Sequence, residues 1–359
     1  MPDASAPASI LIVRLSAIGD VVMASALIPA LREAYPDARL AWLTDEANAG
    51  LLRHNPRLDR LFLWPRARWR QLRREGQLRR YLQEMTGLVR SLRRERFDWV
   101  LDTQGLLKSG LWARLAGGKR RVGLGSREGS QWLMTETLDR HGGERRIGSE
   151  YLKLARFLGA EPTHFPMDIV PSADEAARAA EVLAQAGVAG AYAVLCPFTT
   201  RPQKHWFKEH WAELAPRLQR ELGLAAMMLG GPGDDEEARQ IQALCPGIVS
   251  LAGQTGLGEA AAVIAGASLL IGVDTGLTHL GIAMDTPTLT LFGSTRPYLD
   301  TGSATARVLY HAMECSPCRR RPTCGGEFTC MRRHTADTVM AAARELMQTI
   351  GKEMTAHAS

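Results

Sequence analysis

The sequence predicts an α/β protein made of two doubly wound domains, each a parallel sheet with helices on both faces. Short apolar runs of strand length alternate with helical segments, first at Ser9–Ala34, and the alternation starts again after a proline-bearing stretch at Glu161–Pro171. The chain has 359 residues, which is more than one hydrophobic core usually holds. We therefore expect domains at 1–170 and 171–334, followed by a C-terminal helix at 335–359.

The composition excludes several classes of protein. It is 45% hydrophobic and 23% charged, as in ordinary globular proteins. Six cysteines in so long a chain are not a secretory disulfide framework. The first residues, MPDASAPAS, lack the basic and apolar regions of a signal peptide. The longest apolar stretch, Ala260–Val273, is too short to span a bilayer, so we expect a cytoplasmic protein.

The first strand, helix and connecting loop form the stretch around which the chain is organised. An apolar run at Ile10–Val13 leads into the loop Ser16–Asp20, and apolar residues then recur at helical spacing from Val21. Ligands of open α/β sheets bind beyond the carboxyl ends of the strands, where this loop lies. Gly19 lets a ligand approach the backbone, and Asp20 is either a helix cap or a functional carboxylate.

The next part of the chain is strongly basic. After predicted strands at Leu40–Thr44 and Leu61–Trp64, the segment Arg66–Arg96 contains eleven arginines and three glutamates, a charge of +8 in a chain of net charge +6. Leu78–Leu92 carries the apolar stripe of an amphipathic helix. The arginines are either a solvated face or a binding surface for an anionic partner such as nucleic acid, a phosphorylated molecule or a membrane.

A further strand at Phe97–Leu101 ends in Asp102-Thr103-Gln104-Gly105, and Lys108 follows in the next helix. This again places polar groups and a glycine at the carboxyl end of a strand. The segment Gly117–Gly125 is rich in glycine and basic residues and is predicted to be a turn region. A helix is predicted at Tyr151–Leu158.

The second half carries three polar loops after strands. Tyr192–Cys196 leads into the long polar loop 197–206, and Ala225–Leu229 leads into Gly-Gly-Pro-Gly-Asp-Asp, in which a glycine cluster is a tight turn or a weak nucleotide signal. Ser268–Val273 leads into Asp274–His279 at the start of a helix, where free N–H groups and threonine hydroxyls form an anion site. Asp274 would repel a phosphate, so we expect it to point elsewhere or to hold the loop. The last strand is predicted at Thr288–Phe292.

Four of these loops together resemble a known family. SAIGD at 16–20, DTQGLLKS at 102–109, TTRPQKHW at 199–206 and DTGLTH at 274–279 are similar, in this order, to the ADP-heptose:lipopolysaccharide heptosyltransferases of glycosyltransferase family nine. The resemblance covers residues 9 to about 300, and RARWR at 66–70 resembles the heptosyltransferase I subfamily. It implies a GT-B fold, in which two Rossmann-like domains with parallel sheets face a central cleft. The N-terminal domain takes the acceptor, the C-terminal domain takes the ADP-sugar, and the C-terminal helix packs back on the N-terminal domain.

The resemblance also implies roles for single residues. Asp20 matches the catalytic base, and Lys204 matches a lysine that neutralises the leaving diphosphate, although it is otherwise a surface lysine before a helix. His279 is either a site residue or a core histidine. The Asp235 match is loose, because the subfamily tends to have glutamate there. ADP-heptose binding is expected from Thr199, Thr200, Lys204, Asp235, Asp274, Thr275, Gly276, Leu277, Thr278 and His279. Acceptor binding is expected from Ser16, Gly19, Arg66, Arg68, Arg70, Gln104 and Lys108.

The activity implied is inverting transfer of L-glycero-D-manno-heptose from ADP-heptose to the 3-deoxy-octulosonate (Kdo) of a lipid A precursor, with no cofactor required for catalysis. Alternatives within the family are a later core sugar as acceptor or another nucleotide sugar as donor. The expected partners are ADP-heptose, a Kdo–lipid A acceptor and an anionic membrane surface, with the enzyme cytoplasmic and peripheral to the inner membrane. A nucleic-acid-binding protein is the hypothesis from another class, but no recognised motif supports it and no nucleic-acid partner is expected.

The tail departs from the subfamily pattern in its cysteines. Cys315, Cys318, Cys324 and Cys330 follow the spacing C-x2-C-x5-C-x5-C, which a structural zinc site can use. The second pair is not C-x-x-C, so the alternative is a set of reduced cysteines in a basic loop.

Overall fold

The computed structural model describes residues 6–140, 146–295, 297–318 and 321–357. The chain folds into two compact units, one ending at Val170 and the other beginning at Pro171, and Arg146–Ile147 joins the second unit. Within the described ranges, no helix combines the length and the apolar character that a membrane crossing requires.

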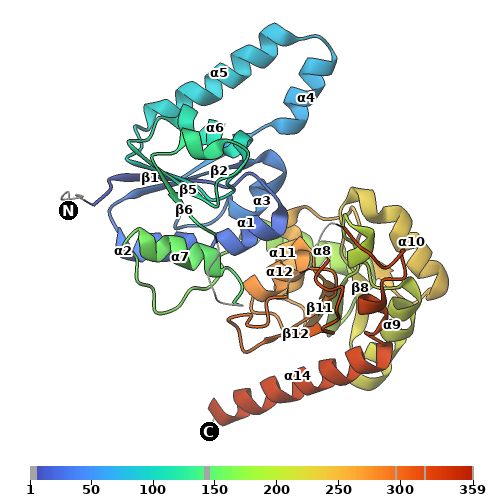
Figure 1. Cartoon of the computed structure of the whole chain (residues 1–359). Coiled ribbons are helices and arrows are strands. Elements are labelled where there is room, and N and C mark those ends of the chain that lie inside the picture. The colour runs from blue at the N-terminus through green and yellow to red at the C-terminus, as the bar shows by residue number, and fades with distance from the viewer. Residues whose placement is uncertain (1–5, 141–145, 296, 319–320, 358–359) are drawn as a thin grey trace. The chain divides into compact units, whose positions relative to one another are not determined.

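The first unit is a six-stranded parallel sheet in the order β3-β2-β1-β4-β5-β6 (Figure 1). Every residue of β1 is buried, because helices α5 and α6 cover one face of the sheet and α2 and α7 the other. The strands are β1 (Ser9–Val13), β2 (Arg39–Asp45), β3 (Arg60–Trp64), β4 (Trp99–Asp102), β5 (Arg120–Leu124) and β6 (Glu136–Leu138). The helices are α1 (Ile18–Ala24), α2 (Leu27–Ala34), α3 (Ala49–Leu52), α4 (Arg66–Arg74), α5 (Leu78–Arg94), α6 (Leu107–Ala116) and α7 (Ser149–Phe157), with 3-10 turns η1 (Glu46–Asn48) and η2 (Ser130–Leu133).

The second unit repeats this topology in a parallel sheet of order β12-β11-β10-β7-β8-β9. Helices α9, α10 and α14 pack together, as do α8, α11 and α12. The strands are β7 (Tyr192–Cys196), β8 (Ala225–Met228), β9 (Val249–Ser250), β10 (Leu269–Val273), β11 (Thr288–Phe292) and β12 (Ala306–Tyr310). The helices are α8 (Ala173–Gln185), α9 (Lys208–Leu222), α10 (Asp235–Leu244), α11 (Leu257–Ala265), α12 (Gly276–Ala283), α13 (Thr329–Arg332) and α14 (Ala336–His357), with 3-10 turns η3 (Pro202–Lys204) and η4 (Pro232–Asp234).

The predicted fold class, α/β with two doubly wound parallel sheets, is confirmed. In each sheet the strand order reverses beside the first strand of the unit, between β1 and β4 and between β7 and β10. Ligands of such sheets bind at the carboxyl ends of the strands at this switch point. Asp20 follows β1 and Gln104 follows β4, whereas Lys204 follows β7 and Asp274 follows β10. Predicted site residues therefore lie at the switch point of each unit.

Several local predictions were wrong. The helix after β1 begins at Ile18 rather than at Val21, so Gly19 and Asp20 lie in its first turn instead of a loop. Gly117–Gly125, predicted to be a turn region, contains β5, because its apolar residues are buried between β4 and β6. The short edge strands β6, β9 and β12 were not predicted.

The C-terminal helix α14 belongs to the second unit. It packs on α9, and Val339, Met340 and Ala343 are buried in the core of that unit. That the helix also packs back on the N-terminal unit stays a prediction.

Candidate functional site

Asp20 is held at the start of α1 by two contacts to one carboxylate oxygen. Its Oδ2 accepts a hydrogen bond from the Ala17 N–H at 3.3 Å and lies 2.7 Å from Nη2 of Arg14. Ala17 is the N-cap residue and has no side-chain oxygen, so the carboxylate satisfies an N–H that would otherwise lack a partner. The Asp20 side chain is still 36% exposed. It therefore serves as the cap and remains accessible to a ligand.

Arg14 is a site residue that the sequence analysis missed. It is buried directly after β1, and its Nη1 donates a hydrogen bond to the Thr103 carbonyl at 2.6 Å. Burial lowers the pKa of Arg14, but the neighbouring Tyr151 and Asp20 raise it by a larger amount, so the net pKa is above its usual value. Arg14 is thus a permanent cation that orients the Asp20 carboxylate. A single basic residue at the end of an otherwise apolar strand was the signal for it.

Gln104, predicted to bind the acceptor, supports the end of β1. Its Oε1 accepts a hydrogen bond from the Leu15 N–H at 3.0 Å, and the residue is buried. Asp102 holds the same turn, since its Oδ1 accepts from the N–H groups of Gln104 and Gly105 at 3.1 Å each. Gly105 has a φ of +70°, and a Cβ there would come within 2.6 Å of the Leu124 carbonyl oxygen. Only glycine fits this turn without a backbone shift.

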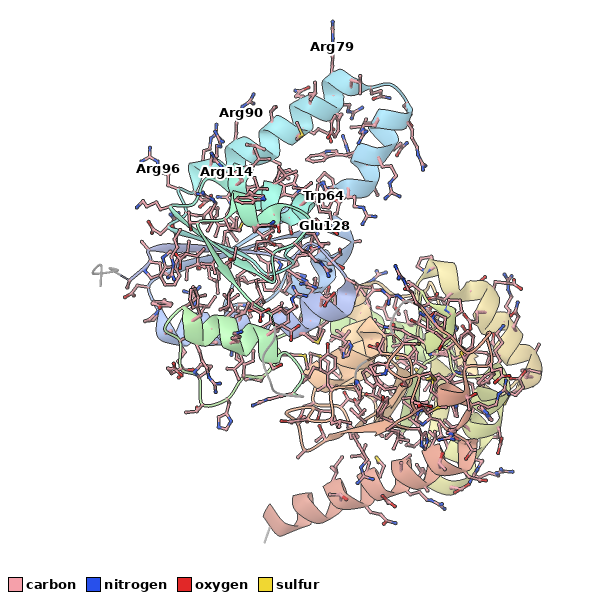
Figure 2. The ribbon with its side chains drawn as sticks, viewed as in Figure 1. Trp64, Arg79, Arg90, Arg96, Arg114 and Glu128 are labelled. Carbon is pink, nitrogen blue, oxygen red and sulfur yellow. The ribbon has the colours of Figure 1, made fainter. Side chains whose placement is uncertain are left out.

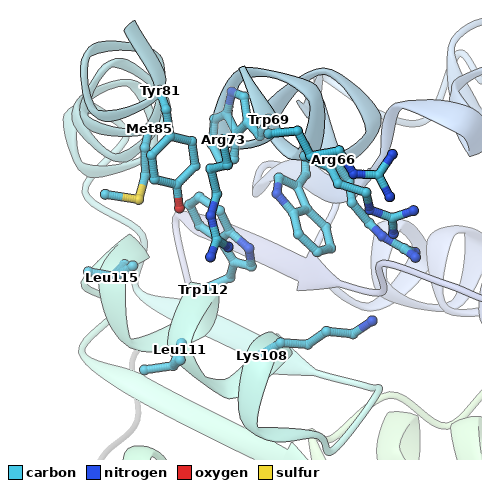
Figure 3. Close-up of a pocket in the computed structure, with 12 residues that line it drawn as sticks. Arg66, Trp69, Arg73, Tyr81, Met85, Lys108, Leu111, Trp112 and Leu115 are labelled. Carbon is cyan, nitrogen blue, oxygen red and sulfur yellow. The ribbon is translucent and has the colours of Figure 1, made fainter. Parts of the chain in front are cut away.

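A groove of about 750 Å³ lies between α4, α5, α6 and the end of β3. Arg66 and Arg70 line it, and so does Lys108, whose Nζ lies 5.7 Å from the ring centroid of Trp64 (Figure 3). Burial and the positive charge of Arg66 lower the pKa of Lys108. The groove therefore brings three of the predicted acceptor residues together.

The structure separates Arg68 from this set. The sequence analysis grouped it with Arg66 and Arg70, but α4 turns by about 100° per residue, so Arg68 lies on another face of the helix. Its guanidinium binds both carboxylate oxygens of Glu84, with Nη2 2.6 Å from Oε1. This ion pair joins α4 to α5.

In the second unit, Asp274 is the centre of a charged cluster. The Lys204 Nζ lies 2.6 Å from Oδ2 and the His279 Nε2 lies 3.3 Å from Oδ1, while Thr295 donates to Oδ2 at 2.7 Å. Burial raises the pKa of Asp274, but His279 and Lys204 lower it more, so the net pKa is below its usual range. As expected, Asp274 holds the loop, and it also fixes the Lys204 ammonium. Thr295 was missed, although it follows a predicted strand.

The N-terminus of α12 fits an anion site. Thr275 is the N-cap residue and has an extended backbone. In the described part of the chain, its side-chain oxygen accepts no capping hydrogen bond from the first turn of α12. Thr278 is buried, and its hydroxyl donates to the Val273 carbonyl at 2.7 Å, so that proton is already used. A Cβ at Gly272 would lie 2.1 Å from the Thr278 oxygen, which explains the glycine in β10. The backbone N–H groups of α12, rather than this hydroxyl, are the available donors.

Two aspartates follow the glycines of the turn after β8, and binding of ADP-heptose by Asp235 stays a prediction. Asp235 begins α10, is exposed and lies 3.2 Å from Nη2 of Arg239. Asp234 instead accepts a hydrogen bond from the Gly231 N–H at 2.7 Å and closes the turn. An acidic residue directly after Gly-Gly-Pro-Gly was the available signal for this role.

His205 anchors the loop that carries Thr199, Thr200 and Lys204. Its Nδ1 lies 2.9 Å from a Glu237 carboxylate oxygen and its Nε2 lies 2.7 Å from the Thr199 carbonyl. Burial lowers the pKa of His205, but the hydrogen bond and charge of Glu237 raise it more, and the net pKa is raised. Two acceptors suit the doubly protonated ring, which donates from both nitrogens.

We expect His205→Gln to destabilise the protein more at acidic than at alkaline pH. Because the folded-state pKa is raised, the stabilisation is complete below the unfolded pKa of about 6.5 and is lost as pH rises through the folded pKa. Melting temperatures measured from pH 5.5 to 9 test this, with the exposed His164→Gln as control. A pH-independent difference between wild type and His205→Gln would show that the charged ring contributes nothing.

A zinc site at the four tail cysteines stays a prediction. Within the described part of the chain, no three His, Cys, Asp or Glu side chains are grouped so as to hold a metal ion. Cys315 is exposed, Cys330 is buried, and the Cys318 Sγ lies 3.9 Å from the Ser294 carbonyl.

Comparison with known proteins finds the same family over most of the chain. Residues 85–327 match the model of glycosyltransferase family 9 (heptosyltransferase). Lipopolysaccharide heptosyltransferase 1 of Pseudomonas aeruginosa is 30% identical over 88% of this chain and 87% of its own length. The Escherichia coli K12 protein of the same name is 30% identical over 82% of this chain and 90% of its own. The solved structure of E. coli heptosyltransferase WaaC with ADP-2-deoxy-2-fluoro heptose has a TM-score of 0.70 at 26% identity, over 94% of this chain and 99% of that one.

Proposed function

The chain belongs to glycosyltransferase family 9, the heptosyltransferases, with the GT-B fold, and from this premise we propose that it transfers heptose from ADP-heptose to Kdo of the lipopolysaccharide inner core. The observation that carries the proposal is the cluster at the switch point of the second sheet. There Asp274 fixes the partly buried ammonium of Lys204. The N–H groups in the first turn of α12, which follows Asp274 directly, are available for a ligand. A diphosphate fits this combination of cation and helix N-terminus.

The reaction is a single displacement with inversion at the anomeric carbon. The acceptor hydroxyl oxygen forms a bond to that carbon as the bond from carbon to the diphosphate oxygen breaks. The hydroxyl proton passes to the Asp20 carboxylate, and the electron pair of the broken bond leaves with ADP. Lys204 and the N–H groups of α12 stabilise the charge that develops on the diphosphate.

Incubation with ADP-heptose and purified acceptors, followed by mass spectrometry, tests the function. We expect an acceptor that ends in Kdo to gain one heptose. A product formed only from an acceptor that already carries heptose would instead support transfer to a later core sugar. The proposal would be overturned if neither acceptor gained heptose and neither incubation released ADP from ADP-heptose.

We propose that transfer needs no metal, because Lys204 supplies the positive charge that a divalent cation gives in other glycosyltransferases. Equal activity with and without EDTA is the expected result. A structural zinc at Cys315, Cys318, Cys324 and Cys330 rests on cysteine spacing alone. Elemental analysis of protein purified without added metal decides it, and about one zinc per chain is the prediction.

On the acceptor side, Arg66, Arg70 and Lys108 are proposed to bind carboxylate or phosphate groups of the acceptor. We expect Arg66→Gln/Arg70→Gln to raise the acceptor KM by about 100-fold or more, since two charge-assisted hydrogen bonds worth about 1.5–3 kcal/mol each are lost. The KM for ADP-heptose should change little. Arg68→Gln is the matched control, because that arginine binds Glu84 instead. An equal rise in acceptor KM for the control would remove the groove from acceptor binding.

A further inference from the structure

Arg140 differs from the many arginines on the surface of the first unit, because its guanidinium binds the backbone at the end of a central strand. Arg79 and Arg90, by contrast, are exposed and project into solvent (Figure 2). Arg140 follows β6 and is half-buried, and its Nη2 donates hydrogen bonds to the carbonyl oxygens of Thr103 at 3.0 Å and Gln104 at 3.2 Å. The guanidinium therefore lies at the carboxyl end of β4, beside the switch point of the sheet.

The Thr103 carbonyl joins Arg140 to Arg14. Nη1 of Arg14 donates to the same oxygen at 2.6 Å, and Nη2 of Arg14 lies 2.7 Å from Oδ2 of Asp20. Two guanidinium cations that share one neutral oxygen repel each other, and the Asp20 carboxylate offsets this repulsion for Arg14. The two arginines thus form a line of contacts that ends on the proposed base.

Both guanidinium groups are tightly enclosed. The Nε atoms of Arg14 and Arg140 are buried, and among the described residues neither has a hydrogen-bond partner. Gly125 leaves the space for Arg140, since a Cβ there would come within 2.9 Å of the Arg140 Cβ and 3.0 Å of its Nε. A buried donor without a partner costs free energy, so stability alone does not account for this arrangement.

Tyr151 belongs to the same cluster. It is buried, and its hydroxyl donates to the Asp20 carbonyl oxygen at 3.5 Å. Burial raises the pKa of Tyr151 above its usual value, while the charges of Arg14 and Arg140 lower it and that of Asp20 raises it. Asp20 and the two arginines therefore act on one buried hydroxyl and share one site.

We propose that Arg140 is a positioning residue for the transfer reaction, which holds Arg14 through the Thr103 carbonyl and so keeps the Asp20 carboxylate directed at the acceptor hydroxyl. The inference rests on the proposed function, from which it takes the role of Asp20 as the base. Without Arg140 the shared carbonyl loses a donor and Arg14 is free to turn, and the carboxylate that Arg14 binds turns with it. Arg140 itself binds backbone, so its loss affects the rate and not the binding of either substrate.

Arg140→Met is expected to lower kcat by about 10- to 100-fold, the usual cost of displacing a catalytic group by about 1 Å. The acceptor KM and the ADP-heptose affinity should stay near their wild-type values. Arg140→Lys should recover part of the rate, because an ammonium can still donate to the same carbonyls. A raised acceptor KM with an unchanged kcat would make Arg140 an acceptor-binding residue and overturn the proposal.

The matched control is Arg121→Met. Arg121 is also half-buried and also binds two backbone carbonyls, those of Leu133 at 3.0 Å and Gly118 at 2.8 Å, but it lies near the start of β5, at the other edge of the sheet from Asp20. Its loss should lower the melting temperature about as much as the loss of Arg140 does and leave kcat unchanged. An equal fall in kcat for the two variants would reduce Arg140 to a structural contact.

A double-mutant cycle with Asp20→Asn separates positioning from general damage. If Arg140 acts through the base, Arg140→Met should cause little further loss of single-turnover rate once Asp20 is an amide. A loss as large in the Asp20→Asn protein as in the wild type would show that Arg140 acts on something else, and the proposal would fall.

Nitrogen-15 NMR of the arginine side chains tests the contact without any turnover. The Nη–H signals of Arg14, assigned with Arg14→Lys, should be separate in the wild type, because both nitrogens are held by fixed partners. They should merge or broaden in Arg140→Met and not in Arg121→Met. Unchanged Arg14 signals in Arg140→Met would contradict the proposal. Signals that changed as expected in a protein that transferred no heptose would keep the contact and reject the proposed function.

Discussion

Asp20→Asn is expected to lower the rate of heptose transfer by about 10²–10⁴-fold, the usual effect of losing a general base. The amide is nearly isosteric, and its oxygen can still accept from Ala17 and Arg14, so α1 should keep its start. It cannot take the proton of the acceptor hydroxyl. Single-turnover rates and ADP-heptose affinity by calorimetry separate the two effects, and the affinity should stay within a few-fold of wild type.

Asp37→Asn is a suitable control for Asp20→Asn, because Asp37 is an exposed carboxylate of the same unit. It should leave the rate unchanged. Near-normal turnover by Asp20→Asn would remove Asp20 from the chemistry and leave it the role of a helix cap that Arg14 holds in place.

Lys204→Ala is expected to weaken ADP-heptose binding and turnover together. A charge-assisted hydrogen bond to the diphosphate is worth about 1.5–3 kcal/mol, so affinity should fall by about 10- to 100-fold. Turnover should fall as well, because the ammonium stabilises the departing diphosphate more in the transition state than in the bound donor. Lys204→Arg should recover part of the affinity, since it keeps the positive charge.

Among the described residues, the variant leaves Asp274 with His279 and Thr295 as its side-chain partners, so the fold of the variant must be checked by circular dichroism. Lys208→Ala is the control, because that ammonium is bound to Gln240 at the surface. Donor affinity unchanged in Lys204→Ala would contradict the proposed diphosphate site. Activity that is lost with EDTA and restored by Mg²⁺ would contradict the metal-free reaction.

The strands and their carboxyl-end loops were predictable because the information is local. A buried parallel strand is a short apolar run, and the loop after it carries the polar residues and glycines that a ligand site needs. Asp20 and Asp274 became candidates in this way, and the order of the motifs indicated the family, which in turn singled out Lys204. Arg14 was missed because the candidate residues were taken from the loop Ser16–Asp20, which begins two residues after it.

In the basic segment, neighbouring residues in the sequence do not predict the directions of the arginine side chains. RARWR has no apolar periodicity, and the sequence led us to group Arg66, Arg68 and Arg70, which alternate around Trp69, as acceptor-binding residues. Packing of Trp69 against Tyr81 and Trp112 makes the segment a helix, and the helical rotation sends Arg68 to Glu84. Partners distant in sequence decided the direction of each arginine.

The sequence by itself determined the class of fold, the positions of most strands and the loops that carry the candidate chemistry, because these follow from hydrophobic periodicity and residue type. Tertiary structure alone decided which side chains of those loops are free. It assigned Thr278 to the Val273 carbonyl, Gln104 to the end of β1 and Asp234 to the glycine turn. The physical reason is that a buried polar group must find a hydrogen-bond partner, and the chain supplies that partner only once it has folded.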